Sequence, residues 1–194
     1  PIEGFSIQEH TPAEYWFTSK EGPWEWKGPV LQMGDCVYGH FLNNKAAFIS
    51  AEWFNEFANV RRDGYDFDSR MDDGIFVDST DINIYNELIR YPSILSKGIR
   101  RRTGYWGKGT KSSFEAIMSR LQMQTYAIIC NFEYEISKKG EPYGWGLARY
   151  STPENYLGSS FRDNVYQHDP QQPYQLIFDH LSEIFPFCSR KELH

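Results

Sequence analysis

The hydrophobic pattern changes its period within residues 110–136, which read TKSSFEAIMSRLQMQTYAIICNFEYEI. In the first half, apolar side chains recur at the i, i+3, i+4 and i+7 spacing of an amphipathic helix, at Phe114, Ile117, Met118 and Leu121. From Tyr126 to Ile136, apolar residues alternate with residues that become more polar along the segment. This alternation is typical of a long strand with one buried face. The segment therefore predicts a helix followed directly by a strand.

Helix and turn signals surround this segment on both sides. Two shorter helices are predicted upstream, over residues 82–89 and 94–102, and a returning strand is predicted downstream, over residues 143–150. Glycines interrupt the chain at GYWGKG, before the third helix, and the turn sequence SKKGEP joins the two strands. The order helix, helix, turn, helix, hairpin is that of a winged helix-turn-helix, which we expect over residues 81–150.

The segments that flank this motif complete an expected α+β fold. Residues 1–80 predict an N-terminal helix-hairpin-helix region packed on the core, and residues 151–194 predict C-terminal helices. Within the first 80 residues, a helix start is predicted at Thr11 and Pro12, and a loop around Trp24–Pro29. A hairpin is predicted over residues 36–50, with its turn at Asn43 and Asn44. A helix over residues 51–61 and a loop over residues 62–80 are predicted to follow.

Composition limits the class of protein. The chain has 194 residues, of which 40% are hydrophobic and 17% aromatic, enough for the core of one domain or of two closely packed halves. No apolar run approaches the roughly 20 residues of a membrane span, and no signal-peptide pattern opens the chain. Three widely separated cysteines indicate reduced thiols rather than a disulfide framework. We therefore expect a cytoplasmic protein that does not contact a membrane.

Metal and cofactor sites are not predicted. The five histidines are scattered, and none stands at metal-site spacing from another histidine or a cysteine. The aspartates of residues 63–73 form an acidic cluster that could attract a divalent cation, but the spacing of an EF-hand is missing. This stretch favours a solvated acidic loop, in which Asp66 or Asp68 pairs with Arg61 and Arg62.

Charge is distributed unevenly along the chain. The formal net charge is −6, which by itself argues against a nucleic-acid partner. The window of residues 97–120, however, holds seven basic residues and one acidic residue, so it carries +6 and leaves −12 for the rest of the chain. Because the window covers the second and third helices of the expected motif, its charge falls on elements that a winged helix presents to a duplex. A solvated basic face is the alternative explanation.

The candidate nucleic-acid contacts combine charge with small polar and aromatic side chains. Lysine and arginine neutralise phosphates, serine and threonine donate to them, and exposed aromatic rings stack on bases. For Tyr105 and Trp106, stacking on bases and packing in the core are equally open. The expected partner is double-stranded DNA, and a non-catalytic protein-interaction domain is an alternative. The predicted contact residues are Arg100, Arg101, Arg102, Tyr105, Trp106, Lys108, Thr110, Lys111, Ser112, Lys138 and Lys139.

Several short segments resemble one family. Residues 104–108 (GYWGK), 140–145 (GEPYGW) and 150–154 (YSTPE) are similar to a winged-helix unit of the AlkZ (YcaQ-like) DNA glycosylases and of the AlkZ-related proteins. Upstream, VYG, KAAFIS and RRDGYD, which begin at Val37, Lys45 and Arg61, resemble the AlkZ-related group in particular. The likeness covers most of the chain, and it implies a winged-helix protein related to DNA repair.

The same resemblance implies a possible chemistry. AlkZ enzymes excise alkylated bases with a Gln-x-Gln or Gln-x-Asp motif, and Gln122-Met123-Gln124 matches its form. The resemblance therefore names Gln122 and Gln124 as catalytic candidates of a DNA glycosylase. Strand alternation also explains Gln124 as an outward polar residue, and a single wing domain is less than the full enzyme architecture. DNA binding without catalysis is the main prediction, and base excision is the alternative.

Overall fold

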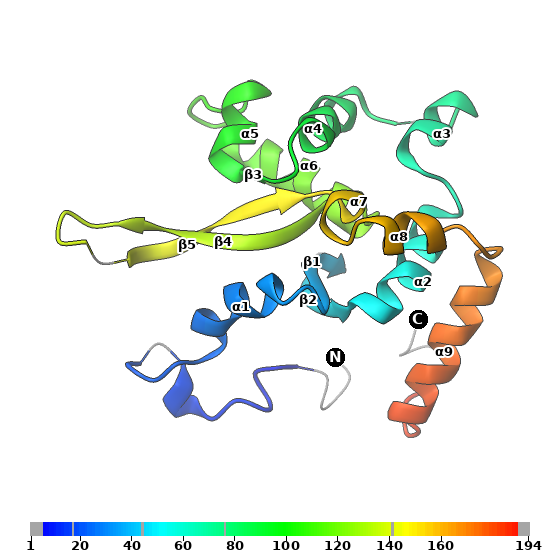
Figure 1. Ribbon diagram of the computed structural model, residues 1–194, viewed down its shortest axis with the longest axis horizontal. Helices are drawn as coiled ribbons and strands as arrows, with labels where there is room; N and C mark the ends of the chain where they lie inside the picture. Colours follow the sequence, from blue (N-terminus) through cyan, green and yellow to red (C-terminus); the bar gives the residue numbers. More distant parts are fainter. Residues whose placement is uncertain (1–5, 17, 44, 76, 141, 190–194) are drawn as a thin grey trace.

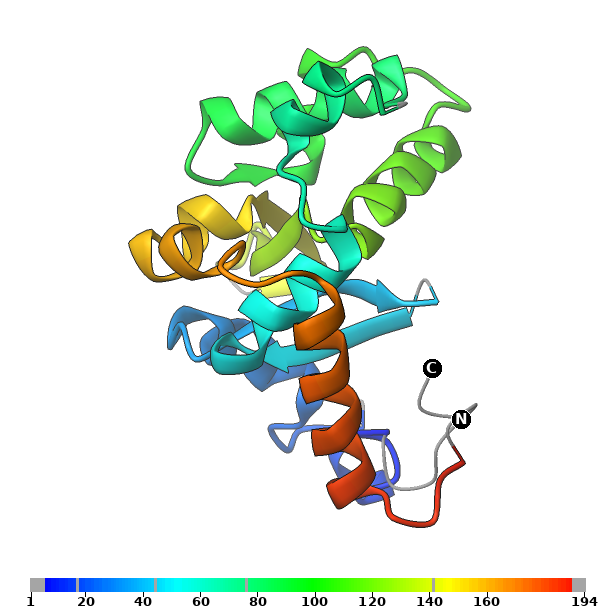
Figure 2. The same cartoon turned by 90° about the vertical axis from the view of Figure 1, so that its right-hand side faces the viewer.

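A five-stranded antiparallel sheet forms the middle layer of the molecule, with helices on both of its faces (Figures 1 and 2). The computed structural model describes residues 6–16, 18–43, 45–75, 77–140 and 142–189, and for Ser112 and residues 142–145 it describes the backbone alone. The α+β class is confirmed. The strand order is β2-β1-β4-β5-β3, and the strands are β1 (Cys36–Leu42), β2 (Lys45–Ser50), β3 (Ile94–Leu95), β4 (Ile128–Ile136) and β5 (Pro142–Ser151).

The two predicted hairpins are confirmed, and they belong to one sheet. β4 and β5 pair from Ile128↔Ser151 to Ile136↔Pro142 and project as a long hairpin at the left of Figure 1. β1 and β2 form the N-terminal hairpin, in which Asn43 adopts a positive φ of 48° at the turn. β1 pairs with the base of β4 at Tyr38↔Ile129, so the N-terminal hairpin extends the sheet on that side.

The helices of the expected motif are α4 (Ser79–Arg90), α5 (Ser96–Arg102) and α6 (Lys111–Met123), and they lie together on one face of the sheet (Figure 1). Two boundaries differ from the predictions. Asp78 rather than Thr80 or Asp81 caps α4, because the Asp78 carboxylate accepts from the Thr80 amide at 2.8 Å. Ile94 and Leu95, predicted as helix, form β3 because they pair with Tyr150 and Arg149 of β5.

The prediction of a loop around Trp24–Pro29 is wrong, because these residues belong to α1 (Pro23–Gln32). Proline fits the first turn of a helix, and the Glu25 carboxylate accepts from the Gly22 amide at 2.8 Å, which stabilises the start of α1. The helix predicted after Thr11 is only a 3-10 turn, Ala13–Tyr15, whose N-cap is Pro12. A side chain at Gly22 would place its Cβ 1.9 Å from the Tyr15 carbonyl oxygen, so this close contact requires glycine.

The remaining helices lie toward the right-hand side of the molecule in Figure 1. They are α2 (Ala51–Arg62), α3 (Phe67–Asp72), α7 (Pro153–Tyr156), α8 (Ser159–Asn164) and α9 (Gln171–Ile184). α3 corrects the prediction of a loop over residues 62–80: the Asp66 carboxylate caps it by accepting from the Ser69 amide at 2.7 Å, and Phe67 is buried. The predicted C-terminal helices are confirmed, and α9 packs on α2 through the stacked rings of His180 and Trp53.

Arg62 joins several of these elements at the centre of the molecule. Its side chain is fully buried, and its guanidinium donates to the Thr125 carbonyl oxygen (2.7 Å), the Glu154 carboxylate (2.6 Å) and the Tyr166 hydroxyl (2.7 Å). Burial by itself lowers the pKa of Arg62, but Glu154 and Tyr166 outweigh burial and raise it, so the cation is retained. Arg62 does not pair with Asp66 or Asp68 as the sequence suggested. It fixes the turn at Thr125, where α6 passes into β4.

Lys27 is a second buried cation, beneath the β4–β5 hairpin. Its side chain is 7% exposed, and its Nζ lies 4.0 Å from the ring centres of both Trp24 and Phe132. Burial lowers the pKa of Lys27 to about 8, although Glu25 opposes this shift. The folded state therefore disfavours the charged form of Lys27, and this lowers the free energy of unfolding. The destabilisation is fully present below pH 8 and declines as pH rises toward the ordinary lysine pKa of about 10.5.

We expect Lys27→Met to be more stable than the wild type at pH 7, and we expect that difference in free energy of unfolding to shrink by about 1–2 kcal/mol at pH 9.5. Urea unfolding of both proteins at the two pH values measures the change. Lys45→Met, at an exposed position of β2, should show no such pH dependence. A Lys27→Met difference that is equal at the two pH values would contradict the account.

Candidate nucleic-acid interface

The predicted cationic residues of α5, α6 and the β4–β5 turn lie at one end of the molecule. Lys97 at the start of α5 pairs with Glu135 near the end of β4, at 3.3 Å, and so holds α5 beside the outer part of the hairpin (Figure 1). Arg101 follows Lys97 by one helical turn, about 6 Å. Lys138 follows Glu135 by three residues, about 10 Å of strand. We call this set the basic end, and it comprises Arg100, Arg101, Arg102, Lys108, Lys111, Lys138 and Lys139.

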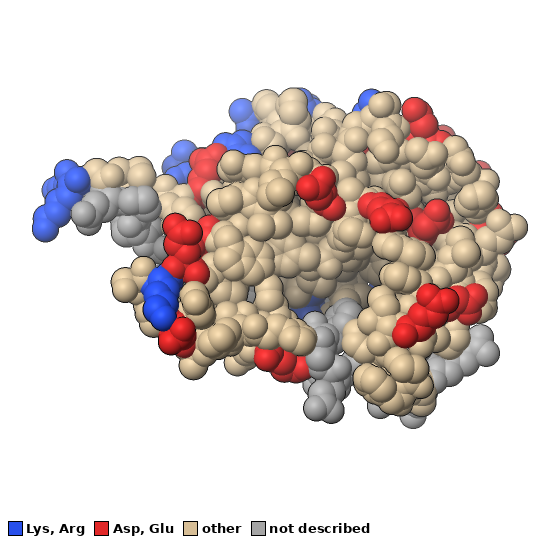
Figure 3. All heavy atoms as spheres, turned by 60° about the horizontal axis from the view of Figure 1, so that its bottom comes forward, with Lys and Arg blue, Asp and Glu red and all other residues tan. Residues whose placement is uncertain are grey.

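Most charges of the basic end are exposed and lack a carboxylate partner. Arg101 and the four lysines are exposed, and no ion pair among the described residues includes them. Arg102 is also exposed, but its Nε lies 3.8 Å from Glu87. Figure 3 shows lysine and arginine atoms at the projecting end and along the neighbouring rim, with acidic atoms beside them and over the rest of that face. The exposed cations without an ion-pair partner therefore come from α5, from the approach to α6 and its first residue, and from the β4–β5 turn.

The loop between α5 and α6 has a defined conformation. Gly104 and Gly109 both adopt φ of 84°, a region that favours glycine. The Tyr105 carbonyl oxygen accepts from Arg100 Nε (3.1 Å) and from the Thr110 hydroxyl (2.6 Å). The predicted contact residue Thr110 therefore uses its hydroxyl proton within the loop, and its oxygen remains an acceptor.

The two aromatic residues of this loop, Tyr105 and Trp106, have different environments. Tyr105 is half-buried, and its ring centre lies 6.2 Å from that of Phe114 in the core. Trp106 is 50% exposed, and the guanidinium carbon of Arg101 lies 4.3 Å from its ring centre. Tyr105 thus packs against the core, whereas Trp106 faces solvent beside the arginines.

The outer face of α6 carries small side chains. Its inner face buries Phe114, Ile117, Met118 and Leu121. The first turns of the helix expose Lys111, Ser113, Glu115 and Ala116, and the side chain of Ser112 lies outside the described part. Small residues allow a helix to approach another surface closely, and Glu115 is the one carboxylate among these exposed positions.

Gln122 is buried between α6 and β1. Its side chain is 1% exposed, its Nε2 donates to the Met118 carbonyl oxygen at 3.0 Å, and its Oε1 accepts from the His40 amide at 3.2 Å. A Cβ at Gly39 would lie 3.2 Å from Oε1, so the strand passes close to the amide. Both ends of the Gln122 amide therefore connect α6 to β1, and it offers no exposed surface to a substrate.

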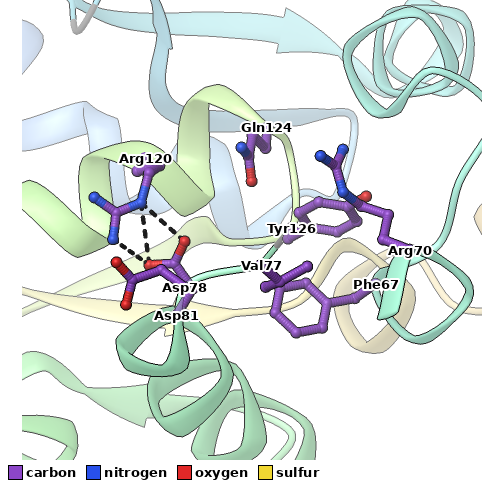
Figure 4. A pocket seen from close by; sticks show the side chains of 8 residues that line it. All are labelled: Phe67, Arg70, Val77, Asp78, Asp81, Arg120, Gln124 and Tyr126. Atoms are coloured by element: carbon purple, nitrogen blue, oxygen red, sulfur yellow. Dashed lines mark hydrogen bonds and ion pairs between the residues drawn. The ribbon is translucent and has the colours of Figure 1, made fainter. Parts of the chain in front are cut away.

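Gln124 lines a cavity of about 250 Å³ at the other end of α6 (Figure 4). Asp78 and Asp81 lie at one side of the cavity with Arg120, and Arg70 lies at the opposite side beside Tyr126. The cavity lies between α3, the start of α4, the end of α6 and the start of β4. Its lining residues are Phe67, Arg70, Val77, Asp78, Asp81, Arg120, Gln124 and Tyr126.

Hydrogen bonds hold the polar walls of this cavity in place. The buried Asp81 carboxylate accepts from Arg120 Nε at 2.8 Å. Hydrogen bonds from Thr80 lower the pKa of Asp78, so Asp78 stays ionised at neutral pH. The Tyr126 hydroxyl donates to the Tyr65 carbonyl oxygen at 2.9 Å, and burial raises the pKa of Tyr126. The sequence did not predict this cavity, because its walls come from segments up to about 60 residues apart in the chain.

The cavity and the basic end are separate surfaces. Gln124 follows Lys111 by 13 residues, which is about 20 Å along a helix axis. Arg120, which contributes to the basic window of the sequence, points into the cavity and is neutralised by Asp81. Gln122 and Gln124 therefore lie at the opposite end of α6 from Lys111, with Gln122 buried against β1 and Gln124 in the wall of the cavity.

Comparison with known families assigns the chain. The model of the AlkZ-related family matches residues 1–194. The chain belongs to the AlkZ-related family. The resemblance noted in the sequence is thereby confirmed over the whole chain. Comparisons of this AlkZ-related protein with curated proteins and with solved structures gave no significant match.

The cysteines and the candidate metal ligands lie apart in the described part of this AlkZ-related protein. Its three cysteines are free thiols. Burial raises the pKa of Cys130 to about 11 and also raises that of Cys36, so both remain protonated at neutral pH. The described residues bring together no group of three or more His, Cys, Asp or Glu side chains that could hold a metal ion. None of the described helices is long and apolar enough to cross a membrane.

Proposed function

We propose that this AlkZ-related protein binds double-stranded DNA through its basic end, with residues 81–150 acting as a winged helix-turn-helix. The order α4, β3, α5, α6, β4, β5 supports this assignment, as does the adjacency of β3, β5 and β4 in the sheet. In this arrangement α6 is the recognition helix and the β4–β5 hairpin is the wing. Residues 1–80 and 151–194 then form two flanking parts packed around the motif.

The observation that carries the proposal is the cluster of exposed cations without carboxylate partners. Each phosphate that such a cation neutralises releases condensed counterions, and this release drives binding to duplex DNA. Lys108 and Lys111 stand where α6 begins, and the amide groups of a helix start add partial positive charge. Lys138 and Lys139 at the wing tip extend the contact along the duplex. The protein would thus meet the backbone on both sides of α6.

The negative net charge does not oppose this contact at physiological salt. Charges farther away than the Debye length, about 8 Å at 0.15 M ionic strength, are largely screened. The acidic residues 63–73 lie around α3, at the opposite end of Figure 1 from the wing tip. The charge of residues 63–73 is therefore largely screened from phosphates at the wing tip.

Fluorescence anisotropy with a 20-base-pair duplex tests the proposal across a salt series. We expect binding at about 50 mM salt, and we expect log K to fall with log salt at a slope of about −4.5 if five phosphates are neutralised. The alternative of a protein-interaction domain predicts no DNA binding. Absence of binding at 50 mM salt would reject the proposal.

A second candidate function is base excision, and it is favoured by one observation: Gln124 lines a cavity that also contains an aromatic wall and charged groups. An excised base must leave the helical stack and enter a pocket. A duplex on the basic end would need to extend about 20 Å along α6 to bring a base there. In this function Gln124, rather than the buried Gln122, would contact the substrate.

We expect Gln124→Ala to slow release of an alkylated base from duplex DNA by about 100-fold if base excision is the function. Gln167→Ala, an exposed glutamine outside the cavity, is the matched control and should leave the rate unchanged. The assay measures free base and abasic sites after incubation. Equal rates for the wild type and Gln124→Ala would exclude Gln124 from any such activity.

A further inference from the structure

Trp106 is unusual among the tryptophans whose side chains are described, because it is the exposed one. Half of its surface is open to solvent. Trp16, Trp24, Trp26 and Trp53 are each partly buried. An exposed indole is a large apolar surface, and such surfaces on a folded protein commonly mark an interaction site.

Two arginines approach the ring of Trp106, and half of the surface of this residue remains exposed. Arg101 lies over the ring at 4.3 Å, and Arg100 lies farther away, at 5.7 Å. The preceding residue is anchored, because the Tyr105 carbonyl oxygen accepts hydrogen bonds from Arg100 and Thr110. A side chain that is already ordered loses little conformational entropy when it binds. The indole is therefore a prepared contact surface.

The charge around Trp106 selects the chemistry of its partner. Arg101 and Lys108 are exposed and lack carboxylate partners among the described residues. A partner at this position must therefore offer negative charge next to a flat apolar surface. A nucleotide does both, because its phosphate is anionic and its base stacks on aromatic rings. In a fully paired duplex the base faces are already stacked, so an indole finds an open base only where one is unpaired.

We propose that Trp106 stacks on an unpaired base, and that the protein prefers duplex DNA with an unpaired nucleotide over fully paired duplex DNA. This inference rests on the proposed function, since the basic end must first hold a duplex. The arginines and lysines hold the backbone of either DNA, and Trp106 adds a contact that only the interrupted duplex completes. Trp106 is thus the residue that determines the preference for DNA structure.

Two 20-base-pair duplexes test the inference, identical except that one carries an extra 2-aminopurine as a single-nucleotide bulge. We expect the wild type to bind the bulged duplex about tenfold more tightly, and we expect the 2-aminopurine fluorescence to fall as the base stacks. Trp106→Ala should lose the preference and bind the two duplexes with equal affinity. Trp106→Phe should keep part of the preference. Lys108→Glu should weaken both complexes equally.

The possible results distinguish failure of the Trp106 inference from failure of the proposed DNA binding. A wild-type protein that binds both duplexes with equal affinity overturns the inference and leaves duplex binding intact. The same holds for a preference that persists in Trp106→Ala. Failure of the wild type to bind either duplex overturns the proposed function together with the inference. Circular dichroism of the two Trp106 variants confirms that the comparison is made on folded protein.

Discussion

Replacing Arg62 with methionine is expected to lower the free energy of unfolding by about 3–5 kcal/mol. The substitution removes the cation that pairs with Glu154 and leaves that carboxylate partly buried without its partner. It also removes the donor to the Thr125 carbonyl oxygen, which lies in the turn between α6 and β4. Because removing one member of a buried ion pair costs more than the pair itself contributes, the loss should exceed that of an ordinary core substitution.

The neighbouring arginine provides the control for this experiment. Arg61 is exposed, and its guanidinium donates to one carbonyl oxygen, that of Phe41, at 3.3 Å. We expect Arg61→Met to lower the free energy of unfolding by less than about 1 kcal/mol. Urea denaturation at pH 7 compares both variants with the wild type. Equal losses for Arg61→Met and Arg62→Met would show that Arg62 does not have the central role described here.

Reversing two charges of the basic end should nearly abolish binding to duplex DNA. For the double variant Lys108→Glu with Lys111→Glu, we expect an affinity about 100-fold lower at 100 mM salt and a log–log salt slope shallower by about 2. Both side chains are exposed, so the thermal unfolding midpoint should not change. The effect therefore reports on lost phosphate contacts and not on folding.

Lys45→Glu is the matched control for charge reversal. Lys45 is exposed on β2, outside the basic end, and the substitution changes the net charge in the same direction. We expect its duplex affinity to stay within about twofold of the wild type at 100 mM salt. If Lys45→Glu weakens binding as much as one reversal at the basic end, then the interaction depends on total charge and has no defined site.

The central elements of the fold were predictable because their signals are local. The change of period within residues 110–136 is a property of neighbouring side chains, and α6 and β4 follow it within two residues. α1 was missed because Gly28 and Pro29 resemble helix breakers, whereas the interaction between Glu25 and Gly22 and the packing of α1 beneath β4 stabilise a helix there. A packed surface can thus override unfavourable local propensity.

The position of charges was predictable, but their pairing was not. Arg120 and Arg102 both belong to the basic window of the sequence. In the structure, however, Asp81 neutralises Arg120, and Glu87 lies near Arg102. Asp81 and Arg120 are 39 residues apart, and no periodic pattern connects residues at such a distance. Arg62 was assigned to an acidic neighbour for the same reason, although its partner Glu154 is 92 residues away. Pairing across the core needs the three-dimensional fold.

Hydrogen exchange with and without a 20-base-pair duplex tests the proposed binding surface most directly. We expect DNA to slow amide exchange in residues 100–112 and at the wing tip around residues 137–140, because these amides lie beside the lysines and arginines that meet the phosphates. Exchange around α3 and the cavity, residues 67–81, should stay unchanged. Protection confined to residues 67–81 while the basic end exchanges as in the free protein would contradict the account.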